Sequence, residues 1–264
     1  MDSSLNIGYS TCPNDTFIFC HLAQKTEFCA HLQDVETLNR WAFEERLDVT
    51  KLSFHAWLKL RDRYTLLNAG SALGRGCGPL VIVRRDAADA EQLLADGTVA
   101  VPGEYTTAHL LLRLWRPDIQ NRIFMPFDRI MDAVESGEAD AGVIIHEGRF
   151  VYEERGFCCV QDLGAWWENT TGLPIPLGCI AARASLGRTR IAEIEQQIRT
   201  SVQTAFDDPE STRDYVKRYA QELDDAVIRE HIQTYVNHYT LELGDDGRTA
   251  VEKLAEMAES AGVI

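Results

Sequence analysis

Short apolar runs alternate with helical patterns along the first two-thirds of the chain. Several runs, such as 141–146, are apolar on both faces, which is typical of strands that helices cover on both sides. Alternation at this spacing predicts an α/β fold with parallel sheets built from βαβ units. The predicted strands span residues 5–10, 52–54, 79–84, 99–102, 123–127, 141–146 and 158–163, and the predicted helices span residues 36–46, 56–67, 90–94, 107–115 and 129–136.

The last third of the chain, from about residue 183, reads as one helix after another. Residues 208–210 predict a helix start, with Asp208 as the N-cap and proline at the first helical position. Another helix is expected over 227–236, and a final one ends near residue 262. The first of these helices carries an apolar stripe at 3.6-residue spacing, made of Ile191, Ile194, Ile198, Val202 and Phe206.

Two stretches rich in glycine and proline, 70–79 and 171–178, interrupt this order. Each alone is typical of a surface loop. As a pair around one block of sequence, they indicate two crossings between two lobes. We therefore predict a discontinuous first lobe, formed by residues 1–78 and 179–264 with the helical C-terminal segment, and an inserted second lobe formed by residues 79–178.

The charge of the chain limits its partners. The 264 residues include 41 acidic and 26 basic side chains, which give a net charge of -15. Such a surface repels phosphate backbones and anionic membranes, so we expect neither a nucleic acid nor a membrane as a partner. If the substrate is a small anion, local donors must hold it against the overall field.

The same sequence indicates a cytoplasmic protein. The first residues contain no basic segment followed by an apolar one, as a signal peptide would, and no apolar run of about 18 residues occurs. The seven cysteines are odd in number and lack the paired spacing of a zinc site, so we expect reduced thiols and no bound metal.

Small polar residues follow three predicted strands, at 10–16, 51–53 and 103–107. Ligands of open α/β sheets bind at such strand ends, where helix N-termini present unpaired N–H groups. Helix capping is the alternative at each place, and for Asn14 and Asp15 we prefer it. Thr106 and Thr107 are the best candidates for holding an anion, because one cap needs only one hydroxyl.

His146 stands at the end of the apolar run 141–145, followed by Glu147. A histidine at a strand end in an α/β cleft is well placed for general acid or base work, since its pKa lies near neutrality. A hydrogen-bonded histidine at a domain edge is the alternative. His55 follows the strand end at 51–54 and is a candidate to assist, whereas a metal site on His231 and His238 lacks the close pair of ligands that it needs.

Other conspicuous features predict structure rather than chemistry. The glycines of 70–79 precede a strand instead of following one, which excludes a phosphate-binding loop and favours a hinge or a close backbone approach. Cys12, near a predicted helix N-terminus, is a candidate for a lowered thiol pKa, but it lacks a partner base and we prefer a structural role. Trp166 and Trp167 are expected in the core, with stacking on a ligand as the alternative.

Five strings together resemble the 1,4-dihydroxy-6-naphthoate synthase family of the futalosine route to menaquinone. The likeness runs from about residue 5 to residue 260 in the same order and at similar spacing. The strings are Cys-Pro-Asn-Asp-Thr-Phe at 12–17, Asp-Val-Glu-Thr-Leu-Asn at 34–39, Gly-Arg-Gly-Cys-Gly-Pro at 74–79, Ile-Ile-His-Glu at 144–147 and Asp-Leu-Gly-Ala-Trp-Trp at 162–167.

The resemblance implies a two-lobed periplasmic-binding-protein-like fold of type II. It also implies a lyase that cleaves cyclic dehypoxanthinyl futalosine to 1,4-dihydroxy-6-naphthoate and dihydroxyacetone without a metal or redox cofactor. The family's general base falls on His146. The expected contacts of the small anionic substrate are Lys51, Leu52, Ser53, Thr106 and Thr107, joined by Ser10 and Asn14 at the first strand end.

Two other functions stay open at this point. Chorismate dehydratase, a sister family of the same pathway and fold, is the rival enzyme, although it lacks this histidine motif. A non-catalytic small-carboxylate-binding protein is the rival from another class. The sequence does not identify the general acid, and it leaves the oligomeric state open, with a homodimer as one option.

Overall fold

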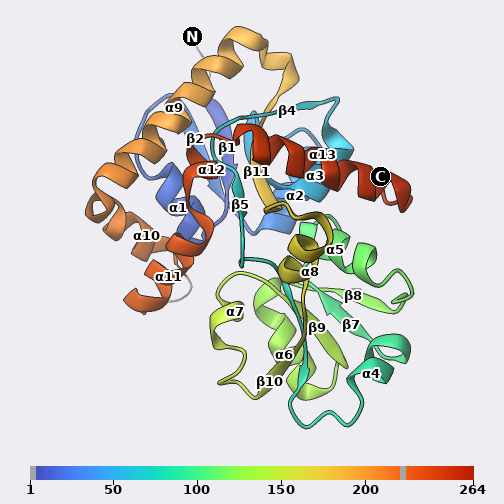
Figure 1. The fold of residues 1–264 in the computed structure, drawn as a ribbon. Helices are drawn as coiled ribbons and strands as arrows, with labels where there is room; N and C mark the ends of the chain where they lie inside the picture. The colour runs from blue at the N-terminus through green and yellow to red at the C-terminus, as the bar shows by residue number, and fades with distance from the viewer. Residues whose placement is uncertain (1–3, 221–223) are drawn as a thin grey trace.

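A computed structural model describes residues 4–220 and 224–264, whose strands form two sheets (Figure 1). The first sheet has the strand order β2-β1-β3-β11-β4, and β5 also pairs with β11. The second sheet has the order β10-β6-β9-β7-β8. The strands of the first sheet are β1 (Leu5–Tyr9), β2 (Phe28–Leu32), β3 (Val49–Ser53), β4 (Tyr64–Leu66), β5 (Ala72–Gly74) and β11 (Ile175–Arg183), and those of the second are β6 (Leu80–Arg84), β7 (Val99–Val101), β8 (Arg122–Phe124), β9 (Ala141–Ile144) and β10 (Phe157–Asp162).

Both sheets are mixed, so the prediction of parallel sheets is wrong in part. β1 is parallel to β2 and β3, and β7 is parallel to β8 and β9, as βαβ units require. However, β11 runs antiparallel to β3, and β6 runs antiparallel to β9 and β10. Apolar periodicity reports which faces of a strand are buried and not which way the strand runs, so it could not reveal these pairs.

Two segments connect the sheets, β5 into β6 and β10 through α8 into β11 (Figure 1). β11 already pairs with β5 at Ile175 and Pro176, so its pairing in the first sheet begins before residue 179, where we placed the return to the first lobe. The division of the chain into lobes at residues 78/79 and 178/179 stays a prediction.

The helices pack around the two sheets, and the long C-terminal helices lie against the first sheet (Figure 1). Near the first sheet are α1 (Pro13–Phe19), α2 (Val35–Phe43), α3 (Phe54–Leu60), α9 (Arg188–Asp207), α10 (Arg213–Tyr219), α11 (Asp225–Tyr235), α12 (His238–Leu241) and α13 (Gly244–Ser260). The second sheet and the junction carry α4 (Ala90–Asp96), α5 (Thr107–Trp115), α6 (Ile130–Ser136), α7 (Gly148–Val151) and α8 (Leu163–Thr171).

The helical C-terminal segment forms as predicted, and its apolar stripe is buried. Ile191, Ile194, Ile198 and Val202 of α9 pack into the core of the first sheet, with Phe206 at its margin. The predicted helix start at 208–210 is present as a 3-10 helix (Pro209–Thr212) that leads into α10, with Asp208 as the N-cap and proline at the first position, but the Asp208 side chain makes no capping hydrogen bond. The predicted helix over 56–67 is too long: α3 ends at Leu60, and β4 follows.

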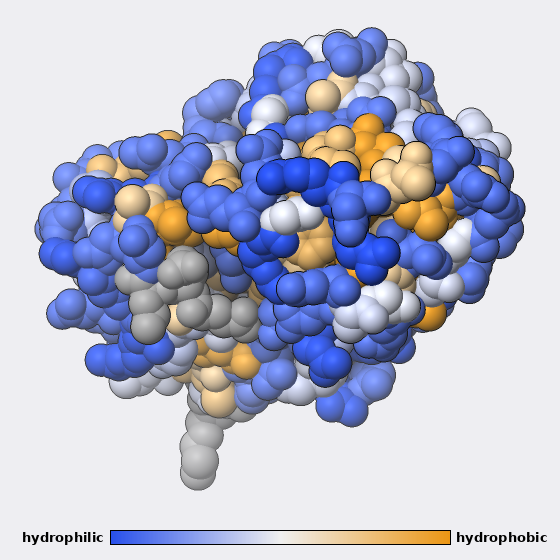
Figure 2. Space-filling model, turned by 90° about the horizontal axis from the view of Figure 1, so that it is seen from below, coloured by the Kyte–Doolittle hydropathy of each residue, from blue (hydrophilic) through white to orange (hydrophobic). Residues whose placement is uncertain are grey.

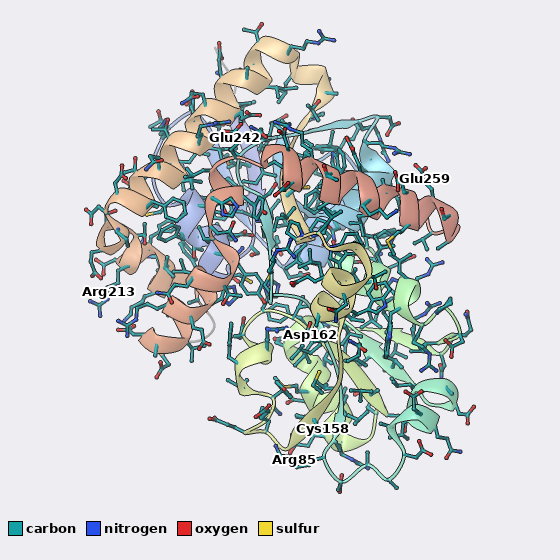
Figure 3. The ribbon with its side chains drawn as sticks, in the orientation of Figure 1. Arg85, Cys158, Asp162, Arg213, Glu242 and Glu259 are labelled. Carbon is teal, nitrogen blue, oxygen red and sulfur yellow. The ribbon has the colours of Figure 1, made fainter. Side chains whose placement is uncertain are left out.

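Two of the recognised strings serve the fold. Asp34 caps α2 and Asp162 caps α8, each by accepting hydrogen bonds from two backbone N–H groups. Asp162 also pairs with Arg149 at 2.7 Å, which ties α8 to the segment after His146. Figure 3 shows Asp162 at the junction between the sheets, far from Arg85 and Cys158 at the outer end of the second sheet.

The face shown in Figure 2 is mostly hydrophilic, with separate apolar patches, as expected from the charge of the chain. Across residues 4–220 and 224–264, no helix combines the length and the apolar character that a membrane span requires.

Gly78 and Gly164 mark the closest backbone approach at the junction. A Cβ atom on Gly78 would lie 2.2 Å from the backbone nitrogen of Gly164, which is far inside van der Waals contact. The expected close approach in the glycine-rich stretch 70–79 is therefore present, between the start of the second sheet and the first turn of α8.

We predict that Gly78→Ala lowers the free energy of unfolding by roughly 1–3 kcal/mol, because the added methyl group must push two backbones apart. Gly148→Ala is the matched control: its Cβ meets ordinary contacts of 3.5 Å or more inside helix α7, so stability should be retained. Chemical denaturation of both variants measures the difference, and equal stability of Gly78→Ala and the wild type would contradict the packing argument.

Candidate active site

The predicted site residues come together around one cavity of about 90 Å³ that lies between the two sheets. It is bounded by the carboxyl ends of β1 and β3, the start of α5 and the segment after β9. The lining includes all eight predicted residues, Ser10, Asn14, Lys51, Leu52, Ser53, Thr106, Thr107 and His146, together with Asp15, Val35, Ala72, Cys77, Pro79, Ala108, Ile145, Leu177, Gly178 and Tyr235.

A buried ion pair lies at the first-sheet side of the cavity. The Lys51 ammonium is 2.8 Å from Asp15 Oδ1, and the two side chains are only 5% and 2% exposed. Ser10 supports the carboxylate by donating from its hydroxyl (2.7 Å) and its backbone N–H (3.1 Å) to Asp15 Oδ2. β1 and β3 are neighbours in the sheet. Asp15, in the helix that follows β1, therefore lies beside Lys51 of β3.

This geometry corrects the capping interpretation of Asn14 and Asp15. The N-cap of α1 is Cys12, which makes no side-chain capping bond, and both polar residues lie inside the first turn of the helix. Asn14 donates from Nδ2 to Asp15 Oδ1 at 2.9 Å, so its amide also supports the carboxylate. Asp15 therefore belongs to the site, although the sequence pattern predicted only a capping role for it.

Ser53, at the end of β3, is held by a residue that the sequence analysis missed. Its backbone N–H donates to Asn39 Oδ1 at 3.0 Å, while Asn39 Nδ2 donates to Ser53 Oγ at 3.1 Å. This double contact fixes the strand end relative to α2. Asn39 is part of the string 34–39. The one sequence feature that could have identified it is a polar residue on the apolar face of a predicted helix.

Both hydroxyls of the paired threonines have partners. Thr106 caps α5 by accepting from the N–H of His109 at 3.3 Å, and it donates to Gly103 O at 3.0 Å. Thr107 donates to Leu177 O at 2.6 Å, which joins α5 to β11. The pair thus orients the N-terminus of α5 toward the cavity, where the unpaired N–H groups of a first turn attract an anion.

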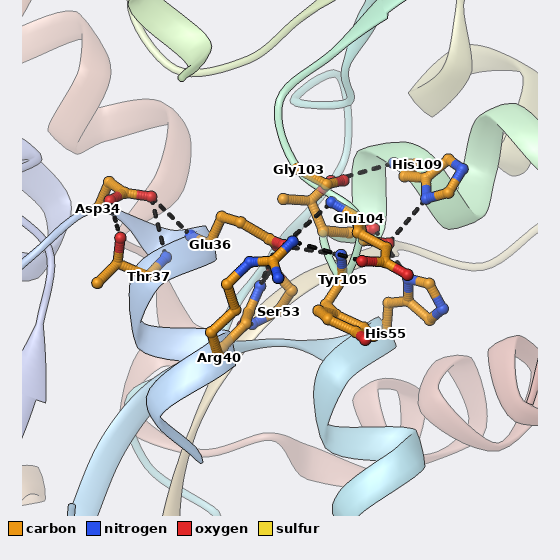
Figure 4. A network of polar contacts seen from close by, with 12 residues as sticks. Asp34, Glu36, Thr37, Arg40, Ser53, His55, Gly103, Glu104, Tyr105 and His109 are labelled. Carbon is orange, nitrogen blue, oxygen red and sulfur yellow. Dashed lines mark hydrogen bonds and ion pairs between the residues drawn. The ribbon is translucent and has the colours of Figure 1, made fainter. Parts of the chain in front are cut away.

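A polar network connects α2 with the loop before α5 (Figure 4). The Glu36 carboxylate accepts from the backbone N–H groups of Glu104 and Tyr105 at 3.1 and 3.0 Å, and Arg40 pairs with Glu36 at 3.1 Å. Burial raises the pKa of Glu36, while these hydrogen bonds act in the opposite direction. Gly103 allows the approach, because a Cβ there would lie 2.6 Å from Glu36 Oε2.

His146 follows β9 in the left-handed backbone conformation, with φ at 56°. This is uncommon for a residue with a Cβ, and such strain gathers at functional sites. Its ring lies edge-on to Phe127, with centroids 4.8 Å apart. Burial lowers the pKa of His146, since desolvation outweighs the opposing effect of Glu147 and Asp15, so the imidazole is neutral at pH 7.

His231, on α11, lies behind His146 with its ring nearly parallel and the centroids 5.9 Å apart. Its Nε2 is 3.1 Å from Asn14 Oδ1, and because Asn14 uses its amide N–H for Asp15, Nε2–H is the donor. Burial lowers the pKa of His231, which keeps this ring neutral as well. A series of polar contacts therefore runs from Lys51 through Asp15 and Asn14 to His231, whose ring stacks on that of His146.

The remaining candidates lie outside this cavity. His55 is buried behind α5, with Nδ1 3.2 Å from Thr106 O, and burial lowers its pKa to about 3. Trp167 is buried and donates to Pro174 O at 3.0 Å, and Trp166 packs beside the core. The pKa of Cys12 is raised by burial, so the idea of a lowered thiol pKa is wrong. Within residues 4–220 and 224–264, no three His, Cys, Asp or Glu side chains gather as metal ligands.

Comparison with solved structures defines the class of this fold. The alkanesulfonate-binding protein of Xanthomonas axonopodis pv. citri superposes with a TM-score of 0.72 at 13% identity, covering 99% of this chain and 94% of the other. A crystal structure of a protein from Archaeoglobus fulgidus superposes with a TM-score of 0.92 at 36% identity, covering 99% and 98%. The chain has the fold of the periplasmic binding proteins, with its cavity between two sheets.

Within that class, the chain belongs to the menaquinone biosynthesis family, whose model matches residues 5–260. A curated relative, the 1,4-dihydroxy-6-naphtoate synthase of Thermus thermophilus, is 47% identical over 98% of this chain and 96% of its own length. Membership confirms the family resemblance that the five strings indicated.

We predict that Asp15→Ala lowers the free energy of unfolding by about 3–5 kcal/mol, because it leaves the Lys51 ammonium buried without a counter-ion. Arg61→Ala is the control: it breaks the pair with Glu259, whose side chains are about half exposed, and should cost at most about 1 kcal/mol. Urea titrations compare the two, and similar small losses would show that the buried pair does not stabilise the site.

Proposed function

We propose that this chain is a 1,4-dihydroxy-6-naphthoate synthase, a lyase that cleaves cyclic dehypoxanthinyl futalosine to 1,4-dihydroxy-6-naphthoate and dihydroxyacetone. The observation that carries the proposal is the position of a neutral histidine, His146, in the same cavity as the buried Lys51–Asp15 pair. The 47% identity with a relative of that name supports the choice of substrate.

In this proposal the substrate carboxylate binds between the end of β3 and the start of α5. Lys51 supplies positive charge, Ser53 a neutral donor, and the first turn of α5 at Thr106 and Thr107 its backbone N–H groups. Leu52 lies in the same wall of the cavity. Ser10 and Asn14 act through Asp15, whose orientation they fix.

His146 acts as the general base. It removes a proton from the ribose-derived part of the substrate, which starts ring opening and a retro-aldol-like break of a carbon–carbon bond. The electron pair of that bond leaves with the three-carbon unit, and enolisation of the dione left in the fused ring to the aromatic naphthalene product drives the reaction. Burial favours this role, because a histidine must be neutral to accept a proton.

The position of the cavity between the two sheets fits a reaction through enol intermediates, which water would divert. The Glu36 network and the Thr107–Leu177 hydrogen bond close opposite sides of the start of α5. We place the reaction in the cytoplasm, where the reduced state of all seven cysteines would persist. A homodimer stays a prediction.

Incubation of the pure protein with the spiro compound and, separately, with chorismate tests the proposal. Mass spectrometry should detect 1,4-dihydroxy-6-naphthoate and dihydroxyacetone from the first substrate and no dehydration of the second. Dehydration of chorismate alone would favour the sister enzyme. Tight binding without turnover of either compound would favour a small-carboxylate-binding protein.

His146→Ala should lower kcat by roughly a hundredfold or more while ligand binding is largely kept, because the general base is lost and the carboxylate contacts remain. His238→Ala, which changes an exposed histidine on α12, is the control and should behave as the wild type. Steady-state kinetics and calorimetry of both variants measure the split. Unchanged turnover of His146→Ala would exclude its role as the base.

The acidic limb of kcat/KM should have its midpoint below the ordinary histidine pKa of about 6.5. Burial lowers the pKa of His146, so the neutral, active form persists into more acidic solution and is lost only when pH falls through that lowered pKa. A pH–rate profile of the wild-type enzyme measures the midpoint. A limb centred above 6.5 would mean that another group controls activity.

A further inference from the structure

We propose that Tyr235 is a further catalytic residue, whose phenolic hydroxyl donates a hydrogen bond to the oxygen of the fused ring that gains negative charge as the naphthol ring forms. The proposal rests on the function given above, since it assigns the partner of the base in that reaction. Neither the sequence patterns nor the family strings point to this residue.

Tyr235 is the last residue of α11, and its side chain lines the cavity together with His146 and Cys77. It is 8% exposed, so the ring is packed within the protein and has little freedom to move. α11 is the helix of the C-terminal segment that reaches from the first sheet to the segment after β9 (Figure 1). The hydroxyl therefore comes from a different element than the base.

The hydroxyl of Tyr235 differs from those of other buried tyrosines. Tyr64 donates to Leu47 O at 2.8 Å, and Tyr9 shares a hydrogen bond with the Tyr215 hydroxyl. Among the residues that the structure describes, none is a hydrogen-bond partner of Tyr235. This hydroxyl is not one of the fully buried polar atoms of the described residues that lack a partner, so it remains accessible, and a substrate oxygen in the cavity would supply its partner.

Tyr235 is a donor and not a second base. Burial raises the pKa of its phenol, as do the nearby Cys77 and Glu147, and Arg149 opposes them only in part. The hydroxyl is therefore protonated at neutral pH. A neutral donor placed beside a developing charge stabilises the transition state more than the ground state.

One buried side chain fixes the base and this donor relative to each other. His231 packs against Tyr235, with ring centroids 4.8 Å apart at 51°, and against His146 at 5.9 Å. His231 is itself held by its hydrogen bond to Asn14. His146 and Tyr235 thus pack against the same His231 ring, which holds them in a fixed arrangement. Such an arrangement can act on two parts of one substrate.

The chemistry balances without a co-reactant. Once the hemiacetal of the spiro ring has opened, His146 takes the proton of the hydroxyl on the former spiro carbon, a carbonyl forms there, and the adjacent carbon–carbon bond breaks. The electron pair leaves with the three-carbon unit, which takes the proton back from His146 and departs as dihydroxyacetone. His146 then removes a proton from the carbon next to the other carbonyl of the fused ring, and the charge moves to that carbonyl oxygen, where Tyr235 donates its hydrogen bond. The proton held by His146 is the one that this oxygen needs to become the naphthol hydroxyl.

Tyr235→Phe tests the proposal, because it removes only the hydroxyl and keeps the ring that packs on His231. We expect kcat with the spiro substrate to fall at least tenfold, on the order of a hundredfold, at an unchanged thermal midpoint. Affinity for 1,4-dihydroxy-6-naphthoate, followed through the near-ultraviolet absorption of the naphthalene, should fall about three- to tenfold. Tyr64→Phe is the matched control and should keep both kcat and affinity, since its hydroxyl lies outside the cavity.

The outcomes separate the two proposals. Normal kcat and affinity in Tyr235→Phe, with an active wild type, would overturn the role of Tyr235 and leave the lyase function intact. A wild type that binds the naphthoate but does not cleave the spiro compound would overturn the lyase function. In that case a loss of naphthoate affinity in Tyr235→Phe still supports its contact with the ligand, and an unchanged affinity overturns it.

Discussion

The buried ion pair between Lys51 and Asp15 is the interaction on which the site depends. Neither charge is stable alone at that depth, so each requires the other and the hydrogen bonds that Ser10 and Asn14 add. The pair forms only because β1 and β3 are adjacent and end at the same edge of the sheet. Through it, a chain of net charge -15 keeps one ammonium group beside the cavity that, in the proposed function, accepts an anion.

The same pair extends toward the reacting groups. Asn14 links the Asp15 carboxylate to His231, and His231 packs against both His146 and Tyr235. The proposed anion contact, base and hydrogen-bond donor therefore belong to one packed unit contributed by both sheets and α11. In the proposed function, two additions turn a fold shared with solute-binding proteins into an enzyme. They are His146, which burial keeps neutral, and Tyr235, whose hydroxyl is free to bond the substrate.

Much of this site could be predicted because strand ends are visible in the sequence. The apolar runs before Ser10 and His146 mark where strands stop, and the rule that ligands lie beyond such ends selected residues that do share one cavity. The stripe of α9 was visible for a similar reason, since its period reports one buried face. Roles were harder to infer, and that of His146 came chiefly from its family string.

What the sequence could not show depends on contacts between distant segments. Asp15 was interpreted as a cap because its partner Lys51 is 36 residues away in the chain and adjacent only in the sheet. His231 and Tyr235 lie on a helix whose own pattern predicts packing, and nothing local reveals that α11 reaches His146. The antiparallel course of β6 and β11 was likewise hidden, because strand direction follows from topology and not from the spacing of apolar residues.

A crystal structure of the wild-type protein with bound 1,4-dihydroxy-6-naphthoate tests the central claim most directly. The account predicts that the ligand lies in the cavity between the sheets, with its carboxylate within hydrogen-bonding distance of Lys51, Ser53 or the first turn of α5. Its ring would then lie between His146 and Tyr235. A carboxylate bound away from the Lys51–Asp15 pair, or a ligand bound outside this cavity, would contradict it.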